Sequence, residues 1–216
     1  MCIRDRSYAE QAQFRIEAAR EAMSQAVQDE PENALAWARL SELWLMQGYR
    51  GRSLKAAKTA RKLAPELERT QTVLGFAALA AIDISKAKKA FRRAIELNSA
   101  DPQPRFGLGL ATIRGGDLEG GSGDIEIAVA LDPDDSLLRS YLGKAYFEQR
   151  TTDPAKYLRE LFTKFPNQEN TLAAEQYAIA KRLDPNDPTP WLYDAIRKQS
   201  ENRPVEALRD IESRSS

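Results

Sequence analysis

The sequence contains no histidine and only one cysteine, Cys2. Histidine is the usual base that activates a catalytic serine or cysteine and is also a common metal ligand, so neither kind of site is expected. A lone cysteine excludes a disulfide framework and a four-cysteine zinc site. Asp134-Asp135 is the best acid–base pair, but it lies in a predicted turn, where acids commonly cap helices. We therefore expect no metal, no cofactor and no enzymatic activity.

An excess of one charge and a long apolar run are also missing. The 32 Lys and Arg residues balance the 32 Asp and Glu residues, so the net charge is zero. Overall charge therefore gives no reason to bind nucleic acid. The best apolar run, residues 73–82, is about half the length that spans a bilayer. We expect neither nucleic-acid binding nor direct membrane insertion by this segment.

The sequence does have an internal repeat with a period of about 34 residues. Leucine recurs with this spacing, and alanine recurs with it further along each unit. Within a unit, apolar residues lie three and four positions apart, which is typical of one face of a helix. Asp-Pro pairs between units end one helix and begin the next. The leucines are Leu40, Leu74, Leu108 and Leu142, and the alanines are Ala60, Ala94 and Ala128.

The pattern resembles the tetratricopeptide repeat (TPR), which reads W-x₂-L-G-x₂-Y, then A-x₃-F, then P. Trp37 and Leu40 match its start in one unit, and Phe91 matches its phenylalanine in the next. The resemblance implies an all-α fold, a right-handed TPR α-solenoid of antiparallel helix pairs. It divides the chain into 7–31 (the last helix of a truncated repeat), 34–67, 68–101 and 102–135 (regular repeats), 136–187 (a fourth, expanded repeat) and 188–216 (a truncated fifth).

The fourth repeat, 136–187, holds 18 more positions than a regular repeat such as 102–135, and two arrangements would explain this. In one, residues 151–168 are an insertion between the two helices of the repeat. In the other, residues 154–165 form the second helix and residues 171–183 form an added helix. We favour the second arrangement because residues 156–162 are amphipathic, but whether 151–168 is a loop or a helix stays open.

Residues 115–123 are rich in glycine. They do not form a phosphate-binding loop, because no Gly-Lys-Ser/Thr sequence follows them. Glycine inside a helix costs about 1 kcal/mol relative to alanine. We therefore expect the second helix of the third repeat to begin late or to fray.

The TPR resemblance implies that the first helix of each pair lines a concave groove. The inward positions are rich in Leu, Phe and Ile, and a contiguous exposed apolar stripe of this kind marks an interaction surface. It would suit an amphipathic helix or an extended peptide, from another protein or from flanking parts of the full-length chain. The predicted groove residues are Leu35, Glu42, Leu45, Met46, Arg69, Phe76, Leu79, Phe106, Leu110, Ile113, Arg114, Lys144, Phe147 and Leu192.

Charge is uneven along the chain. Residues 50–93 contain twelve basic and three acidic residues, whereas residues 94–135 contain two basic and nine acidic residues. Most of the basic residues lie on predicted second helices, which face away from the groove. This pattern indicates either docking of an acidic partner or RNA, or an ordinary solvated surface. RNA is disfavoured because aromatic residues are not interleaved with the basic ones.

Four stretches look like the TPR region of large bacterial envelope proteins, which carry a FecR-type domain before the repeats and an outer-membrane barrel-like region after them. This resemblance implies a periplasmic or outer-envelope location, which the residues alone do not indicate. The expected function is a non-catalytic scaffold for protein–protein interaction. The alternative is a structural spacer between flanking domains that binds no separate partner. The stretches are 33–40, 140–146, 184–196 and 202–208.

The first six residues, MCIRDR, resemble a translated sequencing adapter. Together with the unfinished repeat at 188–216, this indicates a metagenomic fragment of a larger bacterial protein. The absence of a signal peptide then carries no information about the compartment.

Overall fold

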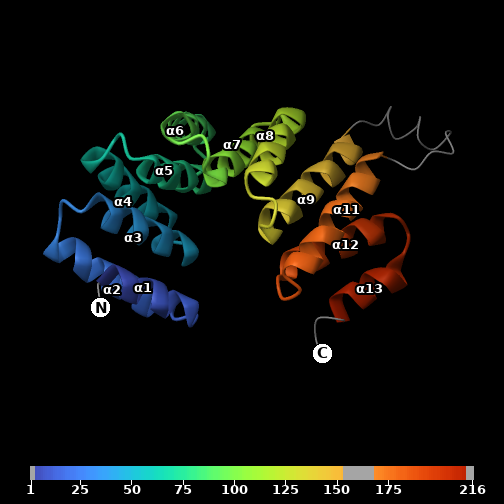
Figure 1. Ribbon diagram of the computed structural model, residues 1–216, viewed down its shortest axis with the longest axis horizontal. Helices are drawn as coiled ribbons and strands as arrows, with labels where there is room; N and C mark the ends of the chain where they lie inside the picture. Colours follow the sequence, from blue (N-terminus) through green and yellow to red (C-terminus); the bar gives the residue numbers. More distant parts are fainter. Residues whose placement is uncertain (1–2, 153–167, 213–216) are drawn as a thin grey trace. The chain divides into compact units, whose positions relative to one another are not determined.

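The computed structural model describes residues 3–152 and 168–212, and all regular secondary structure within those ranges is helical (Figure 1). The prediction of an all-α chain of antiparallel helix pairs is therefore confirmed. The chain forms two compact units, residues 1–111 and residues 112–216, each with its own packing. No helix in the described residues is both long enough and apolar enough to cross a bilayer.

Unit 1 is built from helices that pair with their neighbours in the chain. Contacts join α1 to α2, α3 to α4 and α5 to α6, and further contacts join α3 to α5. The first helices of successive pairs, α3, α5 and α7, begin at residues 34, 68 and 102, which is the constant spacing that the repeat requires. The elements are α1 (Ile3–Ala12), α2 (Ile16–Asp29), α3 (Ala34–Met46), α4 (Arg50–Leu63), α5 (Glu68–Ala80), α6 (Ile84–Leu97) and α7 (Pro102–Arg114), which ends just beyond the unit.

The N-terminal part of unit 1 differs from the prediction. The repeat pattern predicts one helix over residues 7–31, but this segment holds most of α1 and all of α2. The turn between them places Phe14 at a φ of 58°, a conformation that usually calls for glycine or asparagine. The prediction was wrong because no turn-forming residue marks this break in the sequence.

Unit 2 contains α8 (Leu118–Leu131), α9 (Ser136–Thr152), α11 (Gln168–Leu183), α12 (Pro188–Ser200) and α13 (Pro204–Glu212). Helix α9 packs chiefly against α11, while α12 pairs with α13 and also contacts α9 and α11. Each helix thus buries its apolar stripe against a partner that is near in sequence.

The glycines of the repeat make room for aromatic rings. Phe91 is fully buried, and a Cβ atom added to Gly75 or Gly107 would lie 2.4 or 2.3 Å from its ring. In unit 2, a Cβ atom on Gly143 would lie 2.7 Å from the ring of Tyr177, which is also fully buried. The same device therefore joins α5 to α6 and α9 to α11.

This correspondence decides between the two arrangements of the expanded repeat. The ring of Tyr177 packs against Gly143 in the same way that the ring of Phe91 packs against Gly75. The separation in sequence between ring and glycine is 18 residues longer for Tyr177 than for Phe91. Helix α11 therefore takes the place of the second helix of its repeat, and the added residues precede it. The favoured arrangement, which treated residues 171–183 as an added helix, was wrong. Residues 154–165, its proposed second helix, lie outside the described residues.

The glycine-rich segment also departs from the prediction. Helix α8 begins at Leu118, at the regular repeat spacing from the start of α6 at Ile84, so it does not start late. Asp117 caps it by accepting a hydrogen bond of 2.8 Å from the backbone N–H of Gly120. This cap satisfies a backbone donor at the helix start and offsets part of the cost of the glycines.

Candidate protein-binding pocket

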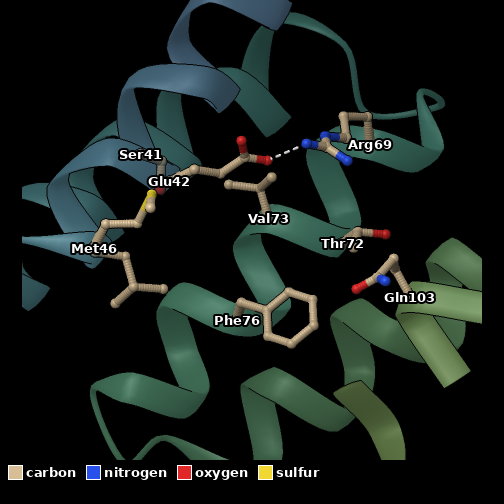
Figure 2. Close-up of a pocket in the computed structure, with 9 residues that line it drawn as sticks. Ser41, Glu42, Met46, Arg69, Thr72, Val73, Phe76 and Gln103 are labelled. Atoms are coloured by element: carbon tan, nitrogen blue, oxygen red, sulfur yellow. Dashed lines mark hydrogen bonds and ion pairs between the residues drawn. The ribbon is translucent and has the colours of Figure 1, made fainter. Parts of the chain in front are cut away.

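An open pocket of about 510 Å³, which we call the inner pocket, lies in unit 1 between α3, α5 and the first turn of α7 (Figure 2). Its wall is formed by helices that are far apart in sequence but adjacent in the repeat. The lining residues are Ser41, Glu42, Leu45, Met46, Arg69, Thr72, Val73, Phe76 and Gln103.

One part of the pocket is apolar and solvent-accessible. Met46 is 54% exposed at the end of α3. The ring of Phe76 packs edge-on against Phe91, with 4.9 Å between the ring centroids, so the core holds this wall in place. An exposed methionine and a fixed aromatic ring that line one pocket offer adaptable apolar contacts to a partner side chain.

The other part of the pocket is charged. Glu42 accepts hydrogen bonds from Arg69 at 2.5 Å and from Arg39 at 3.2 Å (Figure 2 shows the bond from Arg69). Arg39 is almost completely buried, and its guanidinium group lies 4.0 Å from the ring centroid of Tyr8. Glu42 thus links α3 to α5, and the polar side chains of Thr72 and Gln103 also line the pocket (Figure 2).

Part of the predicted groove comes together in this pocket. Glu42, Leu45, Met46, Arg69 and Phe76 line it. Ser41 also lines it, although the repeat pattern did not place it in the groove. Its position next to Glu42 in the sequence was the signal that could have placed it there.

Other predicted groove residues lie elsewhere. Phe106 is only 6% exposed and is therefore a core residue. This contradicts its assignment to an open groove. The repeat pattern predicted its position on the helix but not which side chains cover it. Leu35 is exposed at the start of α3, and Leu79 is partly buried one turn after Phe76. The remaining ones do not line this pocket; they are Leu110, Ile113 and Arg114 on α7, Lys144 and Phe147 on α9, and Leu192 on α12.

Glu68 lies one helical turn before Thr72, and the hydroxyl of Thr72 donates a hydrogen bond to the carboxylate of Glu68. Burial raises the pKa of Glu68 above its ordinary value; the bond from Thr72 partly opposes this rise, and the negative charge of Asp101 adds to it. The folded chain therefore holds this proton more tightly than the unfolded chain. Stability contributed by the protonated form is lost as the pH rises through the folded pKa.

Glu68→Gln is expected to raise the midpoint of thermal unfolding at pH 7, because it removes a partly buried charge beside Asp101. The gain should disappear below about pH 4, where Glu68 is protonated in both states. Circular dichroism melts at the two pH values would measure it, with the exposed Glu32→Gln as the control. A lower midpoint for Glu68→Gln at pH 7 would show that the carboxylate stabilises the fold.

A buried ionic cluster in unit 2 was not predicted. Asp194 accepts hydrogen bonds from Lys181 at 2.7 Å and from Arg197 at 2.6 Å. Lys198 lies 3.1 Å from Asp194 and 2.6 Å from Asp210. Every charge in this cluster has a partner of opposite sign, so the cluster joins α11, α12 and α13 and offers no open ligand position. Among the described residues, no group of three potential metal ligands was found.

Comparisons with known proteins agree with the architecture. The chain gives a TM-score of 0.74 with a TPR protein of Thermus thermophilus, TTC0263, at 19% identity over 95% of this chain and 97% of that one. It gives a TM-score of 0.75 with a chain of the APC/C assembly Cut9–Hcn1, at 17% identity over 94% of this chain and 38% of that one. The chain has the TPR fold. A further TPR structure, YrrB, described as having an unusual peptide-binding site, matches with a TM-score of 0.54 and 16% identity, over 89% of this chain and 90% of that one.

Sequence comparison adds one similar protein. Anaphase-promoting complex subunit 3 of Schizosaccharomyces pombe is 25% identical over 134 residues, which are 62% of this chain and 20% of the relative. The matched region thus spans about a fifth of that relative's length. No family model matches the chain. The finer resemblances, to FecR-type envelope proteins and to a sequencing adapter, stay predictions.

Proposed function

We propose that this chain is a non-catalytic scaffold that binds a protein or peptide segment in the inner pocket of unit 1. The observation that carries the proposal is the pocket itself, with its exposed Met46, its fixed Phe76 ring and the Glu42–Arg69 ion pair. TPR proteins are interaction scaffolds, and the relative YrrB is described as having a peptide-binding site. The partner is a segment with one apolar anchor flanked by polar groups.

The chemistry of the pocket supports binding rather than catalysis. Glu42 and Arg69, the charged residues among the described ones that line it, form an ion pair at 2.5 Å. The hydroxyl of Thr72 donates a hydrogen bond to the Glu68 carboxylate, and the hydroxyl of Ser41 donates one to the backbone carbonyl of Ser53 at 2.8 Å. Ser41 and Thr72 are both buried and already donate to neighbours inside the fold, so neither hydroxyl is exposed to a bound substrate as a nucleophile.

Met46→Gln is expected to weaken peptide binding about tenfold, because it removes an apolar contact of one side chain while keeping its length. Peptides would first be selected from a random display library on the wild-type chain, and their affinities would then be measured by fluorescence anisotropy. Met46 is the better probe than Phe76, because Phe76 also supports the buried Phe91. Ile127→Gln on α8, at a residue that is 43% exposed, is the matched control.

Equal binding to the wild type and to Met46→Gln would reject the pocket as the binding site. If no peptide is enriched over the display background, the spacer alternative is favoured instead. In that alternative, which the resemblance to envelope proteins implies, the repeats only separate flanking domains in the periplasm or outer envelope.

A further inference from the structure

A second pocket of about 510 Å³ lies in unit 1 between the second helices α4 and α6, with residues of α5 at its base. It shares no residue with the inner pocket. We propose that this pocket, which we name the basic groove, binds an acidic peptide segment of a partner protein. Its lining residues are Arg61, Gln71, Leu74, Ser85, Lys86, Lys89, Ala90, Arg92, Arg93 and Glu96.

The basic groove carries positive charge that acidic residues in the described part of the chain do not fully pair. Among its basic residues, Lys86 pairs with Asp83, and Arg93 pairs with Glu66 and Glu96. Its other cations are Arg61 on α4 and Lys89 and Arg92 on α6. All of these are exposed, and none has an acidic partner within the described residues. An anionic partner would supply the missing counter-charge.

The spacing of the cations on α6 makes this charge costly in the absence of a partner. Lys89 and Arg92, the two cations of α6 in this groove without an acidic partner among the described residues, lie three positions apart, so they are neighbours on the helix surface. Like charges that are neighbours on a helix repel each other. Binding of an anion at this face is therefore expected to stabilise unit 1, because a ligand that binds only the folded state raises its stability.

The lining favours a peptide over RNA. No aromatic side chain lines the basic groove, so it has no platform on which bases could stack. Its base consists of Leu74, Ala90 and Gln71, and the side-chain amide of Gln71 already donates to the backbone carbonyl of Pro65 at 2.7 Å. The other groups that a ligand could contact are mainly the Lys and Arg side chains at the edge of the groove, which suit the carboxylates of an acidic peptide.

The test measures the affinity of the full chain for a fluorescein-labelled deca-glutamate peptide by anisotropy at low ionic strength. The variant Arg61→Gln/Lys89→Gln/Arg92→Gln removes the three unpaired rim charges. The control variant Lys55→Gln/Lys58→Gln/Lys62→Gln removes the same charge from exposed positions of α4 that do not line the groove. A uridine RNA of ten nucleotides serves as the competing class of ligand.

The proposal predicts that the groove variant loses affinity about tenfold or more, whereas the control variant loses less than about threefold. The peptide should also raise the thermal midpoint of the wild type and not that of the groove variant. Equal losses of affinity in the two variants would show that the peptide responds only to the overall positive charge of the surface, and this would overturn the proposal. Tighter binding of the RNA than of the peptide, or no binding of the peptide, would also overturn it.

Discussion

Phe91→Ala is expected to destabilise unit 1 by about 3–5 kcal/mol. The ring is fully buried between Gly75 and Gly107, which have no side chains that could fill the space it leaves. It also supports the ring of Phe76 at 4.9 Å, so the inner pocket should lose its fixed wall as well. The midpoint of urea unfolding, followed by circular dichroism, would measure the loss.

Phe14→Ala is the matched control, because Phe14 is 92% exposed in the same unit. Its substitution is expected to change the unfolding midpoint little, since surface substitutions generally cost under about 0.5 kcal/mol. Similar midpoints for the two variants would show that Phe91 does not hold α5, α6 and α7 together.

Asp194→Ala is expected to destabilise unit 2 by about 3–5 kcal/mol, the usual cost of leaving buried charges without their partner. Asp194 is only 6% exposed and is the shared acceptor of Lys181 and Arg197, with Lys198 3.1 Å away. Its removal leaves three cations facing Asp210 and Glu201 alone. Urea unfolding would measure the loss, with the exposed Asp134→Ala as the control.

The same carboxylate predicts a pH dependence. Burial by itself would raise the pKa of Asp194, but the hydrogen bond from Lys181 and the charges of Lys181 and Arg197 lower it to about 2 from its ordinary value of 3.8. A carboxyl group with a lowered pKa stabilises the folded state above its unfolded pKa and loses this effect as the pH falls. The difference between the wild type and Asp194→Asn should therefore shrink from pH 4 to pH 2.

A double variant tests whether the loss comes from unpaired charge. Asp194→Leu/Lys181→Met replaces one buried ion pair with apolar side chains, and it is expected to cost less than Asp194→Ala alone, because fewer buried charges stay unpaired. A double variant at least as unstable as the single one would mean that packing, rather than charge, explains the effect of Asp194.

The repeat spacing and the helix-ending residues in the sequence predicted the starts of the helices in the regular repeats closely. The constant spacing of Leu40, Leu74 and Leu108 corresponds to the starts of α3, α5 and α7 at residues 34, 68 and 102. Helix periodicity and Asp-Pro breaks depend on neighbouring residues only, so one sequence is enough to read them. The inner pocket was predicted in part for the same reason, because Glu42, Met46 and Arg69 occupy repeated helix positions.

Features that depend on contacts between distant residues were not predicted. The sequence favoured α11 as an added helix, and only the packing of Tyr177 against Gly143 showed that it completes the fourth repeat. Phe106 looked like a groove residue, but it is buried. The cluster around Asp194 joins side chains of three helices, and nothing in the spacing of those residues marks them as partners.

The sequence by itself thus determined the helical class, the repeat length and the positions of most helices, because these follow from the local order of apolar, small and helix-ending residues. The tertiary structure decided which helix pairs with α9, which inward positions stay open to solvent and which charges are buried together. Those outcomes depend on how side chains from separate helices fill one shared space, and a periodic pattern does not specify that filling.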